Sequence, residues 1–390
     1  MCIGIGLRLW MIRVSPLDPR FSDADDGDYY HRALRLAVTG QYVDDSWLIR
    51  PPLHVFFFAL WLRLALLLGQ PQLGVLFVEL AQTAVAALTI LLGHSVARRL
   101  FRSERVGLLF AAFLALWFSF VEQPSVLFSE LLYLFLFLLH FWLLLRFDAT
   151  GRRRDLALSG VALGAAALTR SPALYSLAFV VLWLVVRYWN NRRAPDQLQI
   201  ADCRLQIANP DLQSPPASAC HPSASLRASL VTLSPCHLVT QVLLVIACCL
   251  AVVLPWTARN YIVYQRFIPV DTLGQTNLWL DLDAVDKRNE HISAMRRLPQ
   301  ADRASYAMAR AREILAADPW RPFRPMWDTF RHIWKLQFVE DYFVKRSFFS
   351  RPLRAAAPLG LAGDLLWLVY TVGGLIGLAA PPREGLHNRL

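Results

Sequence analysis

Acidic, tyrosine and arginine side chains gather in the segment over residues 23–54, DADDGDYYHRALRLAVTGQYVDDSWLIRPPLH. Asp25, Asp26 and Asp28 come just before Tyr29, and Arg50 directly precedes two prolines. A carboxylate can remove a proton from an acceptor hydroxyl, and an arginine can hold an anionic phosphate by charge-assisted hydrogen bonds. The segment therefore predicts proton transfer beside phosphate binding. The alternative is that the aspartates are ordinary solvated loop residues.

Other ionisable residues stand where apolar runs begin or end. Glu130 opens the run SELLYLFLFLL, where a carboxylate facing lipid would be costly. Arg170 lies in TRSP between two apolar runs, and Arg259 and Asn260 follow a third run in PWTARNY. We expect these side chains to meet the acidic segment at one face of a membrane. For Arg259 the alternative is that it only anchors a helix end at the lipid headgroups.

The composition is that of a membrane protein. Of the 390 residues, 56% are hydrophobic and only 18% are charged, against about 25% in ordinary soluble domains. The net charge of +11 comes mostly from arginines between apolar runs, which sets membrane topology and does not indicate nucleic-acid binding. The six cysteines show no spacing typical of a metal site or a disulfide framework.

Apolar runs of roughly 18 to 24 residues with few charges predict transmembrane helices. The expected fold class is an all-α polytopic membrane protein with extracytoplasmic loops. An apolar piece at 1–14 is too short to span alone, and we interpret it as the end of a clipped first span. The predicted spans are 73–97, 107–122, 125–146, 156–170, 173–189, 239–258 and 358–380.

Arginine-rich loops orient these spans, because such loops stay in the cytoplasm. The loops in question are 97–105, 146–154 and 187–193. Their position places the acidic loop 15–50 outside. The apolar stretch 53–69 then has no crossing to make, and with Arg63 in its middle it is predicted to lie in the outer interface. An ordinary span is the alternative.

The chain divides by composition and hydropathy into five parts. An N-terminal transmembrane catalytic module is followed by a Pro- and Ser-rich cytoplasmic insert with expected disorder. One span then leads to a long outer loop with amphipathic patterns such as 303–318, and a last span and tail follow. Within the first module, 156–170 and 173–189 are predicted to form a re-entrant hairpin with an outer tip. The parts are 1–193, 194–238, 239–258, 259–355 and 356–390.

Several stretches resemble the GT-C membrane glycosyltransferases that use polyprenyl-phosphate sugars. Relatives include the protein O-mannosyltransferases, the lipid A aminoarabinose transferases and the lipopolysaccharide-core sugar transferases of that type. The order and spacing of the stretches cover residues 8 to 280. They are Asp25-x3-Tyr29-x3-Ala33 with Gly40 beyond it, RPPLHVFFFAL, SELLYLFLFLL, GVALGAAALTRSPAL and PWTARNYIVYQRFIPVDTLGQTNLWL. The resemblance implies a GT-C-type helical bundle.

The resemblance also implies roles for particular residues. Asp25 matches the catalytic base or acceptor-orienting carboxylate, and Asp26 matches a neighbouring acceptor or metal contact. The basic positions expected to bind the donor phosphate are Arg50, Arg170 and Arg259. The other expected site positions are Asp28, Tyr29, Glu130 and Asn260.

The implied activity is an inverting transfer of one sugar from a polyprenyl phosphate to an extracytoplasmic hydroxyl of a glycan, lipid or protein. The implied location is the plasma (inner) membrane, as a multi-pass enzyme. Ile49 stands where some relatives carry a metal-binding glutamate, so no cofactor is firmly expected and a divalent cation is an alternative. Relatives usually continue with several more spans, so truncation is also expected.

Two other functions stay open at this point. One is a transporter or flippase of a lipid-linked solute, and the other is a non-catalytic remnant of the glycosyltransferase family. A transporter would place its ionisable residues near the middle of the bilayer and show two related halves. An enzyme acting on a lipid-linked sugar would instead gather them at one face.

Overall fold

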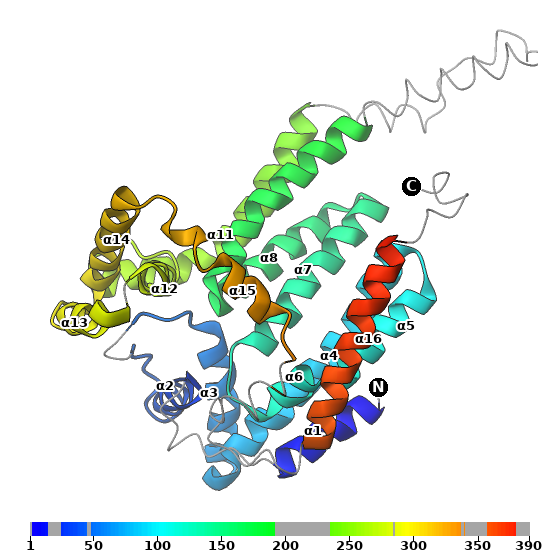
Figure 1. Ribbon diagram of the computed structural model, residues 1–390, viewed down its shortest axis with the longest axis horizontal. Coiled ribbons are helices and arrows are strands. Elements are labelled where there is room, and N and C mark those ends of the chain that lie inside the picture. The colour runs from blue at the N-terminus through cyan, green and yellow to red at the C-terminus, as the bar shows by residue number, and fades with distance from the viewer. Residues whose placement is uncertain are drawn as a thin grey trace, which may run out of the picture.

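The computed structural model shows a chain of helices joined by short connections (Figure 1). It describes residues 2–14, 25–44, 48–191, 235–283, 285–336, 339 and 357–379. Most of the predicted insert 194–238 and the end of the predicted outer loop 259–355 lie outside the described residues. The described part is helical and contains no strand, which confirms the predicted all-α class.

Five helices of the described part are long and apolar enough to cross a membrane. They confirm the predicted multi-pass character, with edges that differ from the predicted spans by a few residues. Because α11 already begins at Pro235, the last residues of the predicted insert belong to a helix. The five are α4 (Gly74–Phe101), α7 (Glu130–Thr150), the segment Ser171–Asn191, α11 (Pro235–Tyr264) and α16 (Ala357–Ala379).

The predicted span 107–122 is not one continuous helix, because the chain bends by 62° at Trp117. The bend leaves carbonyl groups at the end of the first half without helical partners. The buried guanidinium of Arg8 donates to the carbonyl oxygens of Leu114 at 3.0 Å and Ala115 at 3.2 Å. No proline or glycine marks the bend in the sequence, so it was not predicted. The helices involved are α1 (Cys2–Val14), α5 (Glu104–Leu116), α6 (Phe118–Glu122) and η3 (Gln123–Ser125).

Two glycines let α8 (Arg153–Thr169) pack closely on α11. A Cβ atom on Gly160 would stand 2.6 Å from a carbonyl oxygen of α11, and one on Gly164 would stand 2.6 Å from the carbonyl oxygen of Cys249. Their spacing of four puts both on one helix face, and small residues there allow close backbone approach. The packing fixes the end of α8 from which Arg170 projects.

After α8 the chain turns through η4 (Ser171–Tyr175) into a helix over residues 176–191. The segment Ser171–Asn191 passes the length and composition test for a full span. The hairpin of α8 and this segment is therefore longer than the short re-entrant one predicted from 156–170 and 173–189.

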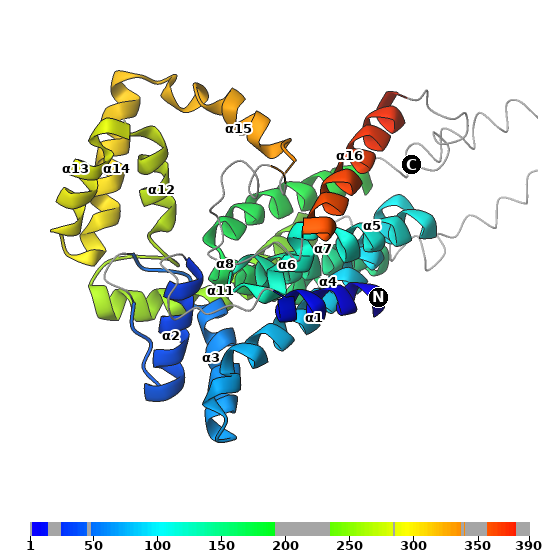
Figure 2. The ribbon, with the colours of Figure 1, turned by 60° about the horizontal axis from the view of Figure 1, so that its bottom comes forward.

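The acidic segment and the stretch that follows Arg50 form two helices, α2 (Asp25–Thr39) and α3 (Leu53–Leu67), which lie side by side (Figures 1 and 2). With 15 residues, α3 is shorter than a spanning helix, in keeping with the predicted interfacial position. Arg63 in its middle donates to the carbonyl oxygen of Ala37 at 2.8 Å. Its charge therefore joins α3 to α2 and does not face lipid alone.

The chain after α11 folds into a helical group, where a long outer loop was predicted. Trp279 and Leu282 pack against Met295, Ala307 and Ala311 in one buried cluster. The amphipathic pattern at 303–318 does form a helix. Its buried face carries small alanines, which give only a weak sign in the sequence that other helices pack against it. The members of the group are α12 (Leu273–Leu282), α13 (Val285–Arg296), α14 (Gln300–Ala317), η6 (Arg321–Phe323) and α15 (Met326–Ile333).

The arrangement separates two ends of the molecule. The junction of α4 with α5 and the junction of α7 with α8 lie toward the same end, whereas α2 and α12 to α14 lie at the other (Figure 1). The arginine-rich loops 97–105 and 146–154 thus share one end, and the acidic helix faces the opposite one. Which end is cytoplasmic stays a prediction from the arginine distribution.

Candidate functional site

The first turn of α2 presents Asp25, Asp28 and Tyr29 together. Spacings of three and four residues place these side chains on one helix face. Carboxylates are also favoured at a helix N-terminus, because the free backbone N–H groups and the helix dipole stabilise negative charge there. The aspartate cluster of the sequence thus becomes the start of a helix rather than a loop.

Arg50 reaches all three of these side chains. Its Nη2 donates to Asp25 Oδ1 at 2.9 Å, its Nε stands 2.7 Å from Asp28 Oδ2, and its Nη1 donates to the Tyr29 hydroxyl at 3.1 Å. The guanidinium also stands 5.0 Å from the centre of the Tyr29 ring. Pro51 and Pro52 hold the adjoining backbone and start α3. Three predicted site residues and Arg50 therefore form one cluster.

A second ion pair adjoins this cluster. Glu130 begins α7, Arg170 follows the last residue of α8, and the two side chains are paired. Arg170 also donates to the hydroxyl of Ser129 at 3.4 Å. Burial raises the pKa of the Tyr29 hydroxyl, Arg50 opposes this rise, and the charge of Glu130 adds to it. The charge of Glu130 is thus felt at Tyr29, inside the Arg50 cluster.

A row of ion pairs between acidic and basic side chains runs from Asp28 to Arg259. Arg32 pairs with Asp28 at 2.9 Å and with Asp44 at 3.4 Å. Arg259 pairs with the other oxygen of Asp44 at 2.8 Å, and the Tyr264 hydroxyl also donates to Asp44. Arg259 is therefore linked to Arg50 through Asp44, Arg32 and Asp28, at the far end of a shared network. The structure does not place it directly against Asp25.

Two predicted site residues have mainly structural contacts. Asp26 is buried, and its Oδ1 accepts the backbone N–H of Gly27 at 3.0 Å. Asn260 is fully buried and donates to the carbonyl oxygens of Ile268 at 3.1 Å and Val270 at 3.2 Å. Asn260 thus fastens the connection that follows α11.

His54 supports the Arg50 cluster from inside the protein. Its ring is fully buried and meets the Tyr29 ring edge-on at 4.1 Å between centroids. Burial lowers the pKa of His54 well below its ordinary value, and the nearby charges of Arg50, Arg32 and Arg170 lower it further. The imidazole is therefore neutral at physiological pH, so it packs against Tyr29 without adding charge.

The electrostatics keep Arg50 charged. Burial acts to lower the pKa of Arg50, but Tyr29, Asp25 and Asp28 outweigh it and raise that pKa above its ordinary value. An arginine that is already held in place by carboxylates is prepared to receive another anion in their stead.

An apolar notch is built partly from chain segments that adjoin the two arginines in the sequence. It has a volume of about 240 Å³, and its walls come from the start of α3, the end of α8 and from α11. Pro52 in its wall is two residues from Arg50, and Leu168 is two residues from Arg170. The lining is Pro52, Leu53, Phe56, Leu168, Val252, Pro255 and Trp256. Charged and apolar surfaces thus meet at one place.

Residues 49–198 match a family model described as dolichyl-phosphate-mannose-protein mannosyltransferase. Over these residues the predicted family resemblance is confirmed. The match covers Arg50, His54, Glu130 and Arg170, whereas Asp25 and the rest of α2 lie before it. No curated protein is significantly similar to the chain.

The matched region supports a mannosyltransferase-like glycosyltransferase in a multi-pass membrane protein. It runs from Ile49, the residue before Arg50, through α3, α4, α7, α8 and the helix over 176–191, and ends at residue 198. Both arginines of the paired clusters therefore come from the part of the chain that resembles this family. Among the described residues, no group of three or more His, Cys, Asp or Glu side chains is arranged to hold a metal ion.

Sequence reasoning missed several members of the network, namely Arg32, Asp44, His54 and Ser129. A signal for Arg32 exists in the sequence, since it follows Asp28 by four residues and Asp25 by seven on a helix. Asp44 carried no such signal, because its contact with Arg259 joins residues 215 positions apart.

Proposed function

We propose that the protein transfers one sugar from a polyprenyl phosphate to an extracytoplasmic hydroxyl, with inversion at the anomeric carbon. The observation that carries this proposal is the clustering of Asp25, Arg50, Glu130 and Arg170 beside an apolar notch. A carboxylate and two arginines at such a boundary suit a substrate that is part anion, part sugar and part lipid. The acceptor would be a hydroxyl of a glycan, a lipid or a protein.

Arg50 and Arg170 are the proposed donor phosphate ligands. Guanidinium groups bind phosphate oxygens by paired hydrogen bonds and stay charged at all relevant pH values. The side chains of the two residues are held by acids, Arg50 by Asp25 and Asp28 and Arg170 by Glu130. Donor phosphate would replace part of these contacts. Arg259 is already paired with Asp44, so it is proposed to influence the donor site only through the shared network.

Asp25 is the proposed general base. Its side chain is 58% exposed and pairs with Arg50, whereas that of Asp28 is 21% exposed and pairs with both Arg32 and Arg50. When the donor phosphate binds Arg50, the carboxylate of Asp25 loses its positively charged partner and becomes a better proton acceptor. Donor binding would thus prepare the base, and Asp28 would stay in place as a structural bridge.

The proposed step balances as a single displacement. The acceptor oxygen forms a bond to the anomeric carbon on the side opposite the phosphate, while the bond from that carbon to the phosphate oxygen breaks. The hydroxyl proton passes to Asp25, and the electron pair stays on the departing polyprenyl phosphate. Arg50 and Arg170 stabilise the charge that develops on this leaving group.

The apolar notch is proposed to receive the first isoprene units of the donor. Its lining is almost entirely apolar, and it includes Pro52 and Leu168, each two residues along the chain from an arginine of the proposed donor site. A prenyl tail would bury apolar surface there, at about 25 cal/mol for each Å² removed from water. The phosphate would then be placed between the lipid boundary and the carboxylates.

The experiment that tests this function is a transfer assay with the purified protein in lipid vesicles. The donor is a polyprenyl-phosphate mannose, and the acceptors are a panel of glycans, lipids and hydroxyl-bearing peptides. We expect formation of a mannosylated acceptor with stoichiometric release of polyprenyl phosphate. If no acceptor is modified and the labelled donor instead equilibrates across the vesicle membrane, the transporter alternative replaces this proposal.

A further inference from the structure

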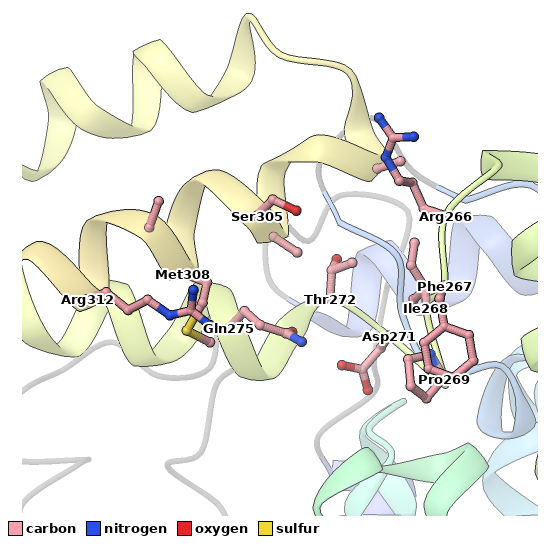
Figure 3. Close-up of a pocket in the computed structure, with 13 residues that line it drawn as sticks. Arg266, Phe267, Ile268, Pro269, Asp271, Thr272, Gln275, Ser305, Met308 and Arg312 are labelled. Atoms are coloured by element: carbon pink, nitrogen blue, oxygen red, sulfur yellow. The ribbon is translucent and has the colours of Figure 1, made fainter.

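Two cavities outside the arginine cluster meet at a single carboxylate. The larger, of about 470 Å³, lies between the connection after α11 and α14, and the smaller, of about 320 Å³, lies between η4 and α12. Figure 3 shows the larger one with its lining residues. Both cavities are lined by Pro269, Asp271, Gln275 and Met308. The two cavities therefore adjoin each other and together make up a hollow, with Asp271 at their junction.

Asp271 is buried but not fully used by the protein. It is 7% exposed, and its Oδ1 accepts the backbone N–H of Leu273 at 2.9 Å. Its Oδ2 is buried and makes no hydrogen bond of ordinary geometry within the described part of the chain. Burial raises the pKa of this carboxyl, while hydrogen bonding by Ser171 and by the backbone N–H groups of Leu273 and Gly274, and the charge of Arg50, oppose the rise. A buried carboxylate oxygen that lacks a well-aligned donor is able to accept a hydrogen bond from a ligand.

The hollow is tied firmly to the arginine cluster. Thr272, next to Asp271, accepts the backbone N–H of Ile49 on its hydroxyl at 3.1 Å. Its own backbone N–H donates to the carbonyl oxygen of Ile49 at 3.0 Å. Ile49 directly precedes Arg50, so these two bonds fix the floor of the hollow relative to the proposed donor site.

The lining chemistry favours a sugar. In Figure 3 the Asp271 carboxylate and the Gln275 amide point into the same space, with Met308 from α14 beside them. A carboxylate and an amide can bind hydroxyl groups, while a methionine packs against the C–H face of a pyranose ring. The volume is within the range of about 300 to 1,000 Å³ typical of small-molecule sites.

Arg266 and Arg312 also line the larger cavity, so an anionic ligand is the alternative to a neutral one. Arg266 already pairs with Asp302 at 3.1 Å. In Figure 3 its guanidinium points away from Asp271. An anionic ligand at the junction would also meet the carboxylate of Asp271.

We propose that this hollow binds a neutral saccharide, with Asp271 Oδ2 accepting a hydrogen bond from one of its hydroxyl groups. The role of that saccharide as the acceptor rests on the proposed function, but its binding does not. Asp271 is here a binding residue, and the transferred proton still passes to Asp25.

The test is a binding measurement that needs no donor. Saturation-transfer NMR is recorded on the full chain in detergent, with methyl α-D-mannopyranoside and an α-linked mannobiose as probes. Parent protein should saturate the ring protons of at least one probe. Asp271→Asn should weaken that binding by about 10- to 100-fold, the range for a lost hydrogen bond to a charged group. Asp302→Asn, a variant of the aspartate that pairs with the lining residue Arg266, should bind as the parent does.

A second variant guards against loss of folding. Met308→Trp leaves Asp271 intact but fills part of the hollow, and it should also weaken binding. Unaltered binding by both Asp271→Asn and Met308→Trp, or no binding of either neutral probe, would overturn the proposal. Tighter binding of methyl glucuronide than of the neutral glycoside would overturn it too, since the arginines would then dominate.

The two proposals can fail separately. If the protein binds a saccharide through Asp271 but releases no polyprenyl phosphate, the proposed sugar transfer is wrong. The proposed saccharide site then still stands. Transfer that is indifferent to Asp271→Asn at low acceptor concentration would remove the acceptor role of the hollow. In that case the proposed transfer stands.

Discussion

Arg50 donates from Nη2 to Oδ1 of Asp25 at 2.9 Å, which joins the residue before two prolines to the first residue of α2. The pair connects the part of the chain that matches the mannosyltransferase family to an acidic helix outside that match. It also explains the aspartates beside apolar segments. They hold the arginine that is proposed to receive the head group of a lipid-linked donor.

Replacing Arg50 by lysine should impair use of the donor while leaving the protein folded. Lysine keeps the charge but cannot make paired hydrogen bonds to phosphate. We expect kcat/KM for the donor to fall by about 10- to 100-fold, mostly through KM, as for one or two charged hydrogen bonds. Initial rates across donor concentrations measure this. Arg187→Lys is the matched control, because Arg187 pairs with Asp148 at 2.6 Å toward the other end of its helix. An equal loss in both variants would speak against a donor role.

Close packing of α8 on α11 should make Gly164 intolerant of even one methyl group. The added Cβ would stand 2.6 Å from the carbonyl oxygen of Cys249, so Gly164→Ala should cost about 1 to 3 kcal/mol. The melting temperature in detergent measures the effect. Gly373→Ala in α16 is the control, since no atom lies within 4 Å of its added Cβ and alanine favours helix. Equal melting temperatures for the two variants would refute the close helix contact.

Asp271 should make stability depend on pH. Burial raises its folded pKa above the ordinary value of 3.8, so the ionised form is disfavoured in the fold. Stability is therefore lost as pH rises from about 4 through the raised pKa, and it stays lower above that value. Asp271→Asn removes this cost and should raise the melting temperature at pH 8.

The gain from Asp271→Asn should shrink as the pH approaches 4, where the parent carboxyl is protonated. Melting scans from pH 4 to pH 8 measure it. Asp302→Asn serves as control, since Asp302 is partly exposed and paired with Arg266. A gain that is constant with pH would mean that ionisation of Asp271 is not its cause.

Membrane topology gives an independent check. The arginine-rich loops predict that residue 153 is cytoplasmic, and the position of α14 at the same end of the molecule as the acidic helix predicts that residue 305 is outside. In a background without the native cysteines, Ser305→Cys in intact cells should react with an impermeant maleimide. Arg153→Cys should react only after permeabilisation. The reverse pattern would invert the whole scheme.

The sequence predicted the apolar helices well because each is encoded locally by a run of apolar side chains. It did not predict the bend at Trp117. That bend depends on Arg8, from a helix far away in the sequence, which donates to carbonyl groups that lack helical partners. It also missed the helical group after α11. The buried face of α14 carries Ala307 and Ala311, which are too small to give a strong periodic signal.

The candidate site was predictable to a similar degree. Asp25, Asp28 and Tyr29 share a helix face that their spacing already indicates, and Arg50 was singled out by the prolines after it. The pairing of Arg259 with Asp44 was not predictable, since it joins residues 215 positions apart. Asp271 was missed because burial alone sets it apart, and burial there depends on how α12 and α14 fold over η4.

The most direct test of the account is the rate of sugar transfer by Asp25→Asn compared with Asp148→Asn. Both aspartates are about equally exposed, at 58% and 53%, and each pairs with one arginine. Asparagine keeps the size and polarity of the side chain but cannot take the proton. Donor binding is measured separately, by retention of polyprenyl-phosphate mannose on the immobilised protein.

The account predicts that Asp25→Asn lowers the transfer rate by about 10² to 10⁴, as expected for loss of a general base, while it still binds donor. Asp148→Asn should transfer at the parent rate. Transfer by Asp25→Asn at the parent rate, with donor binding intact, would contradict the assignment of Asp25 as the base.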